Sequence, residues 1–379
     1  MRRCLVWIAL LVWGVAAWAA ETEQAGISEF RGGWREVASP GPRQEGKGAL
    51  QVRQEALQAA IPHLEAAVSA EPKNIGYLIS LGYVYLSAGK YQQAKETLFQ
   101  ATERDRKNPL PYLLRAQAEA ALAFMNPDTK AEEIGTALRS FDDAAHLDPT
   151  NSLALIQASS VAFEVGKQEV ALAKLEGALA RPGMTLYRLP IPGDLSPDTS
   201  TSIKIWQHAQ MWQWLEMVAR CQNVARMLLK EGKQKEDASD LDGAEAVYKQ
   251  VLALGRQVGN ARPNLFITVS TALNIMEDAY ISLARVAEAK KSREVEAWNG
   301  ERGVVAIGRE ELLGQLQAYS KRLEDDPPSS VDDTLELEAR SVAWVMRGVG
   351  LSPTHEPLPL GQRGQTPEEA GKPGSSGQK

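Results

Sequence analysis

Histidine and cysteine are the residue types most often found in metal and nucleophilic sites, and this sequence uses them sparingly. It has four histidines and two cysteines among 379 residues. The histidines are His63, His146, His208 and His355. They lie far apart, and none belongs to an HExxH motif or a Cys/His cluster. We therefore expect neither a metal site nor a cofactor.

Two glycine patterns resemble nucleotide-binding motifs. Gly41, Gly46 and Lys47 have the spacing of a phosphate-binding loop, but Gly48 stands where a magnesium-binding Ser or Thr belongs. The glycines between 300 and 308 do not follow a predicted strand, as a dinucleotide-binding turn requires. Both patterns are interpreted as chance matches.

The acidic pairs and the internal cysteine do not indicate catalysis either. Pairs such as Asp142-Asp143 and Glu310-Glu311 are adjacent in sequence, so their side chains diverge on a helix. Cys221 lies in a strongly apolar segment, where a buried thiol is usually inert. We predict a protein that is not an enzyme. The alternative that stays open is a hydrolase or transferase whose site is assembled within residues 203–350, which convergent polar groups in a pocket there would favour.

Three tryptophans between residues 206 and 214 suggest an aromatic platform for a flat ligand. On a helix, Trp206 and Trp214 lie about 80° apart, whereas Trp212 points to the opposite side. Core packing is therefore the preferred interpretation.

The elements that would position any such residues show one recurring spacing, with small and large apolar residues at offsets 0, 4 and 7. The four copies are Ala60, Leu64 and Ala67; Ala94, Leu98 and Ala101; Ala137, Phe141 and Ala144; and Ala171, Leu175 and Ala178. These offsets share one face of a helix. Upstream of the second copy, Leu81, Gly82 and Tyr85 mark a partner helix, in which Gly82 would let the two helices approach closely.

The second copy with its partner helix resembles a tetratricopeptide repeat (TPR), and Ala60 and Ala94 are one 34-residue repeat period apart. The resemblance covers roughly residues 51–182. It implies an all-α fold, a superhelix of helical hairpins that a second helical block continues or caps. Pro62 requires the first copy's helix to start near it or to kink. A fifth, degenerate repeat around residues 225–251 needs an insertion of seven residues and stays an open alternative.

The N-terminal residues indicate export. Arg2 and Arg3 precede an apolar run that ends in Ala17-Trp18-Ala19, which is typical of a cleaved signal peptide. We predict an exported protein of a bacterium, periplasmic or secreted; the minor alternative is an uncleaved N-terminal membrane anchor. Cleavage would leave no stable membrane insertion. The 42 Lys and Arg residues against 48 Asp and Glu residues give a net charge of −6, which provides no electrostatic reason to expect nucleic acid as a partner.

These observations predict six regions along the chain. They are a signal peptide at 1–19, a linker or loose N-terminal cap at 20–50, the TPR array at 51–182, a Pro-rich connection at 183–202, a helical block at 203–350, and a disordered tail at 351–379.

The resemblance also implies a concave groove lined by the first helix of each repeat. The predicted partner-binding residues are Ile79, Tyr83, Leu86, Leu110, Leu113, Gln117, Leu153, Ile156 and Phe163. This lining is mostly apolar and lacks the Lys and Asn set with which one TPR subclass holds a peptide's terminal carboxylate. An exposed apolar groove needs an occupant. The two candidates are a segment of a protein partner, as in a scaffold or adaptor of the cell envelope, and the chain's own Trp-rich helix near 203–230.

Overall fold

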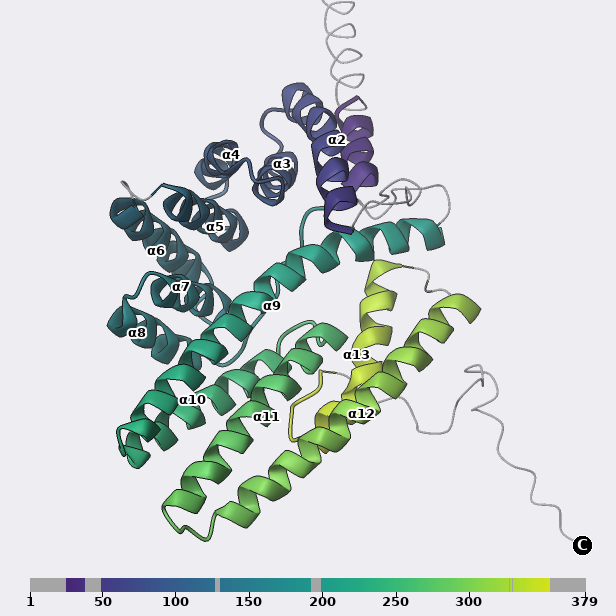
Figure 1. The fold of residues 1–379 in the computed structure, drawn as a ribbon. Helices are drawn as coiled ribbons and strands as arrows, with labels where there is room; N and C mark the ends of the chain where they lie inside the picture. The colour runs from purple at the N-terminus through teal and green to yellow at the C-terminus, as the bar shows by residue number, and fades with distance from the viewer. Residues whose placement is uncertain are drawn as a thin grey trace, which may run out of the picture. The chain divides into compact units, whose positions relative to one another are not determined.

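The computed structural model describes residues 25–37, 49–126, 130–191, 199–326, 328 and 330–354. Within these ranges the regular structure is helical, apart from a single bridge between Asn151 and Gly183, and the protein is all-α (Figure 1). The predicted signal peptide and residues 355–379 of the predicted tail lie outside the described residues. None of the described helices combines the length and apolar character needed to cross a membrane.

The described residues form two compact units. The first covers the described residues up to Gln234, together with residues 330–331, and the second covers the remainder from Lys235 onward. The first unit contains a helix at 25–37, followed by α2 (Ala49–Ala70), α3 (Ile75–Ser87), α4 (Tyr91–Arg104), α5 (Pro109–Met125), α6 (Lys130–Leu147), α7 (Leu153–Glu164), α8 (Gln168–Leu179) and most of α9 (Thr199–Asp237). The second contains α10 (Leu241–Gly259), α11 (Phe266–Ala289), α12 (Val295–Asp325) and α13 (Val331–Gly348).

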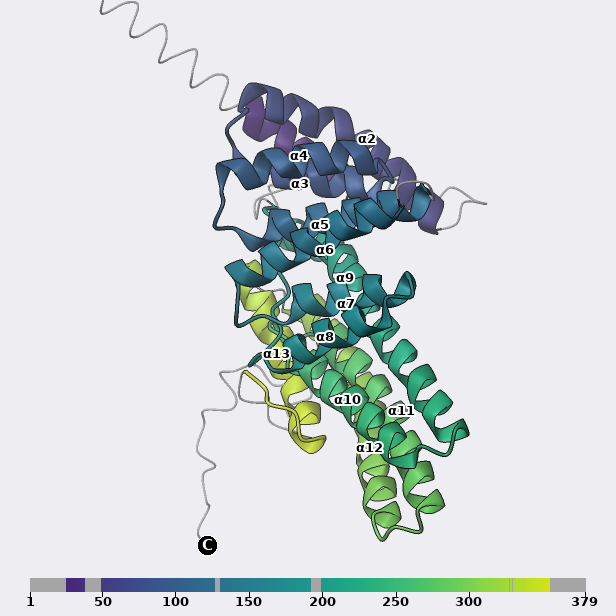
Figure 2. The same ribbon diagram turned by 90° about the vertical axis from the view of Figure 1, so that its left-hand side faces the viewer.

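Helices α2 to α8 form a stack of antiparallel hairpins in which each helix packs against the next along the chain (Figures 1 and 2). The residues of the repeated 0, 4, 7 spacing form the interior of this stack, since all twelve are fully buried. Gly82 allows the close approach predicted for it, because a Cβ atom there would lie 2.5 Å from Cγ of Leu98 on α4.

Asparagines lie at the starts of α3, α5 and α7, and they are the N-cap residues of α3 and α5. The side-chain oxygen of Asn74 accepts a hydrogen bond from the amide of Tyr77, three residues on. Those of Asn108 and Asn151 accept from the amides of Leu110 and Leu153, two residues on. An N-cap side chain satisfies one of the free N–H groups of a helix's first turn. Asn74 and Asn108 are 34 residues apart. This spacing is a further repeat signal that our sequence analysis did not use.

The structure differs from the sequence-based expectation at several element boundaries. Residues 25–37 form a helix, where a linker or loose cap was expected; its Trp34 is fully buried. Helix α2 begins at Ala49 and includes Pro62, so the proline does not start the helix. Within the predicted Pro-rich connection, residues 183–191 form no helix, and the side chains of Met184, Leu186, Leu189 and Ile191 are buried.

Candidate partner-binding surface

The nine predicted partner-binding residues come from the first helices of three consecutive hairpins. Three lie on α3, three on α5 and three on α7. All nine are buried; the most exposed is Leu86, at 9%. The structure therefore places them together on the inner helices, but it does not present their side chains to solvent.

Helix α9 contributes one polar flank to the same inner surface. Arg53 of α2 donates a hydrogen bond to the Glu216 carboxylate at 3.0 Å, and its guanidinium lies 4.6 Å from the centre of the Trp212 ring. Towards the other end, Asn223 donates to Ser160 of α7 at 3.0 Å and to Glu164 at 2.6 Å.

Arg220 completes this flank, because it donates to Glu164 at 3.1 Å. Positions 212, 216, 220 and 223 follow one another at helical spacing, so they lie on the same side of α9. The chain's own helix thus covers the parts of the inner surface formed by Arg53, Ser160 and Glu164.

Burial raises the pKa values of Tyr83 and Glu216 at this contact. Burial is the main cause of the raised pKa of Tyr83, and the nearby Glu216 carboxylate adds to it. Burial also raises the pKa of Glu216, while Arg53 opposes this shift. Arg53, Glu216 and Tyr83 thus form a polar contact between α9 and the array. In this contact the Tyr83 side chain stays a neutral phenol.

A non-helical strap, residues 183–191, connects α9 to the array through hydrogen bonds. Its start is held at the α6–α7 turn, where Ser152 donates its amide to the Gly183 carbonyl at 2.9 Å and Tyr187 donates to Asp148 at 2.9 Å. Its end is held by α9, since the amide of Leu189 donates to Gln210 at 2.9 Å. The strap accordingly joins the last repeats to α9 through ordered hydrogen bonds.

Trp214 and Cys221 occupy interior positions in α9. The indole N–H of Trp214 donates to the carbonyl of Tyr187 at 3.1 Å, whereas Trp212 contacts Arg53. The two rings thus have different partners; the Trp206 side chain lies outside the described residues. Burial raises the pKa of the Cys221 thiol to about 12, which keeps it protonated and unreactive at neutral pH.

The two histidines with described side chains make single contacts. His63 lies 2.7 Å from a Glu29 carboxylate oxygen, and His146 lies 2.7 Å from the Asp142 carbonyl. Across the described part of the chain, no group of three or more His, Cys, Asp or Glu residues is arranged to hold a metal ion.

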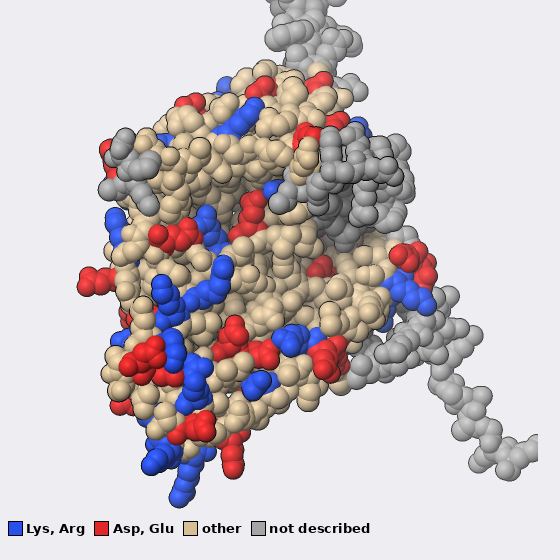
Figure 3. All heavy atoms as spheres, viewed as in Figure 1, with Lys and Arg blue, Asp and Glu red and all other residues tan. Residues whose placement is uncertain are grey.

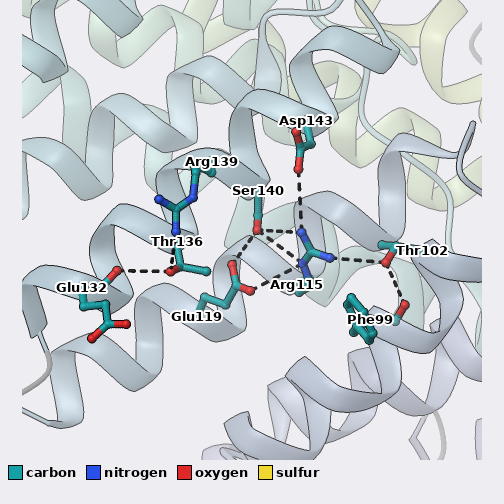
Figure 4. Close-up of polar contacts among 9 residues, drawn as sticks. All are labelled: Phe99, Thr102, Arg115, Glu119, Glu132, Thr136, Arg139, Ser140 and Asp143. Carbon is teal, nitrogen blue, oxygen red and sulfur yellow. Dashed lines mark hydrogen bonds and ion pairs between the residues drawn. The ribbon is translucent and has the colours of Figure 1, made fainter.

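A second polar cluster surrounds Arg115 of α5 (Figure 4). Its guanidinium donates to Ser140 of α6 at 3.0 Å and to Thr102 of α4 at 3.3 Å, and it lies 3.5 Å from the buried Glu119 carboxylate. The centre of the guanidinium is 5.8 Å from the ring of Phe99, which is 50% exposed. Sequence reasoning missed this cluster because its members come from three helices and share no motif.

Charged side chains of both signs are interspersed on the face of the molecule shown in Figure 3. Several large apolar side chains of the hairpin stack are exposed, and none of them belongs to the nine inner residues. They are Phe99, Phe124, Met125, Leu147 and Val170.

Residues 51–118 match the sequence model of the tetratricopeptide repeat family. These residues span α2, α3, α4 and the first part of α5, which are antiparallel hairpins with the repeat's buried positions. The chain contains tetratricopeptide repeats. The TPR match covers the part of the chain in which the residue pattern is clearest.

A curated relative is Hsp70-Hsp90 organizing protein 3 of Arabidopsis thaliana, which is 25% identical over 131 residues. The match covers 34% of this chain and 24% of the relative, so the chain spans about a quarter of that protein's length. Two crystal structures of MamA are also similar. The first is 19% identical, with a TM-score of 0.29, and the match covers 48% of this chain and 93% of the MamA chain. The second is 16% identical, with a TM-score of 0.30, and the match covers 54% of this chain and 96% of the MamA chain.

Proposed function

We propose that this TPR protein is a non-catalytic scaffold or adaptor that holds a protein or peptide partner in the bacterial cell envelope. The observation that carries the proposal is the stack of TPR hairpins from α2 to α8, because stacked repeats create extended surfaces for protein partners. The name of the plant relative, Hsp70-Hsp90 organizing protein 3, supports a role in bringing proteins together.

A partner has two routes to the array. It can bind the nine inner residues after α9 has moved, or it can bind exposed side chains while α9 stays in place. Phe99 represents the second route, because half of its side chain is exposed next to the fixed guanidinium of Arg115. Aromatic residues and arginine are over-represented among residues that dominate binding energy at protein interfaces.

A matched pair of photo-crosslinkers tests the scaffold role and the route together. Replacing Phe99 or Tyr83 by p-azidophenylalanine introduces the same reactive ring at an outer and an inner position. We expect a specific crosslinked partner from position 99, and an internal crosslink to α9 from position 83. A partner captured from position 83 would favour the inner route. The absence of any specific partner from both positions, in native cells, would contradict the scaffold role.

The envelope location rests on the N-terminal sequence and needs its own test. We expect the mature protein in the periplasmic fraction to begin at Ala20, which N-terminal sequencing or intact mass would show. Full-length protein in the membrane fraction would instead favour the uncleaved anchor. Protein in the cytoplasm with an intact N-terminus would contradict export.

A further inference from the structure

Glu338 of α13 is a buried acid in the second unit. Its side chain is 6% exposed, and one carboxylate oxygen accepts a hydrogen bond from the backbone amide of Phe266 at 2.9 Å. Phe266 is the first residue of α11, where N–H groups have no partner within the helix. Glu338 thus caps a helix whose start lies 72 residues away in sequence.

Several neutral hydrogen bonds gather at the same end of α11. Asn264 donates to the carbonyl of Ala261 at 2.8 Å and accepts from the amide of Thr354 at 2.8 Å. The amide of Ser352 donates to Asn260 at 2.7 Å. Ser352 and Thr354, which follow α13, are therefore hydrogen-bonded to the α10–α11 turn, close to the Glu338 cap.

The elements around this cluster carry several titratable or charged residues. Tyr319 of α12 packs its ring 5.3 Å from that of Phe266. Arg262 of the turn is exposed, and Glu336 and Arg340 of α13 form a pair at 3.9 Å with side chains that are 54% and 41% exposed. The first turn of α11 and residues 352–354 contain no charged residue.

Two effects act on the acid in opposite directions. Burial favours its neutral form and the Phe266 amide favours its charged form, and burial prevails, which raises the pKa of Glu338 to about 7. The carboxyl is therefore neutral in the folded unit under mildly acidic conditions, although an exposed glutamate would already be ionised.

We propose that Glu338 is a proton-operated latch. As a neutral acid it stays buried and the start of α11 remains held to α13, whereas as a carboxylate it favours opening, because the hydration that the charge gains outweighs its hydrogen bond to Phe266. This property goes beyond the scaffold role and does not depend on it. A scaffold with such a latch would change the order of its second unit with the pH of its compartment.

The direction of the effect follows from proton linkage. Between about pH 4.5 and pH 7, the folded unit retains a proton that the opened unit releases, so opening becomes easier as the pH rises. Above about pH 7 both forms are ionised, and the effect levels off. We expect the opening equilibrium at the start of α11 to rise roughly ten- to a hundredfold between pH 5 and pH 8.

Hydrogen exchange of the full-length protein tests the latch. The protection of the first turns of α11 is measured from pH 5 to pH 8, corrected for the intrinsic pH dependence of amide exchange. Peptides from α2 to α8 serve as the internal reference. Wild type is expected to lose protection across this range, whereas Glu338→Gln, which keeps an oxygen that can accept from Phe266, is expected to show a flat profile.

Two control variants separate the latch from other titrations. Glu336→Gln removes an exposed acid from the same helix, and His355→Gln removes the histidine that follows Thr354; both should retain the wild-type profile. A direct check is the infrared band of a protonated carboxylic acid in wild type at pH 6, which should lose intensity in Glu338→Gln. Constant protection in wild type, or an unchanged pH profile in Glu338→Gln, would overturn the proposal.

Discussion

At the scale of single residues, Arg115 joins three helices of the array. Replacing it by alanine removes its bonds to Thr102 and Ser140 and leaves the buried Glu119 carboxylate without its countercharge. We expect Arg115→Ala to lower the free energy of unfolding by about 2 to 4 kcal/mol in urea denaturation. Arg139→Ala, at an exposed position of α6, is the control and should change it by less than about 0.5 kcal/mol. If Arg115→Ala changed the free energy of unfolding as little as the control is expected to, the Arg115 cluster would add no stability.

Two glycines on helices of the array should respond in opposite directions to the same change. A Cβ atom at Gly82 would overlap Leu98, so Gly82→Ala should cost about 1 to 3 kcal/mol. At Gly135 of α6 a Cβ atom meets nothing within 4 Å, and Gly135→Ala should stabilise by up to about 1 kcal/mol because alanine favours a helix. Thermal melting of both variants measures the difference. An unchanged melting temperature for Gly82→Ala would show that α3 and α4 can move apart to accommodate the added methyl group.

At the scale of elements, the inner surfaces of α3 and α5 belong to the core. Ile79 and Leu113 are 3% and 0% exposed, so two buried aspartates there would lack partners. We expect the double variant Ile79→Asp, Leu113→Asp to lose its cooperative melting transition in circular dichroism. Met125→Asp, at a residue that is 68% exposed, should melt close to wild type. A folded double variant with wild-type melting would indicate an open concave face.

The helix at 25–37 packs on α3 through two aromatic contacts, one of which joins Phe30 and Tyr77 with ring centres 4.4 Å apart. Trp34 is fully buried, and its ring centre lies 6.1 Å from that of Tyr83. Trp34→Ala should therefore destabilise the protein by about 3 to 5 kcal/mol in urea denaturation, whereas Glu36→Ala on the exposed side should have little effect. Glycines such as those of this segment are typical of a linker, which is why the sequence did not predict a packed helix here. In the structure, Gly33 allows close packing instead, because a Cβ atom there would lie 2.7 Å from Leu64.

At the scale of the whole molecule, the two compact units should lose structure separately. Met276 of α11 is fully buried in the second unit, and Leu98 of α4 is fully buried in the first. We expect Met276→Ala to lower hydrogen-exchange protection in α10 to α12 and to leave α2 to α8 unchanged, with the reverse for Leu98→Ala. Loss of protection in both units from either substitution would show that they unfold as one.

The sequence by itself determined the helical class, the repeat and the buried face of each repeated helix. Residues at offsets 0, 4 and 7 share one side of a helix, so short-range spacing reveals which side is buried. It does not reveal which distant element covers that side. The tertiary structure decided that Arg53 and Ser160 meet α9, that Trp34 packs on Tyr83, and that Glu338 caps α11. Such contacts join residues that are far apart in sequence. They depend on burial and on complementary polar groups, and neither requires a particular spacing along the chain.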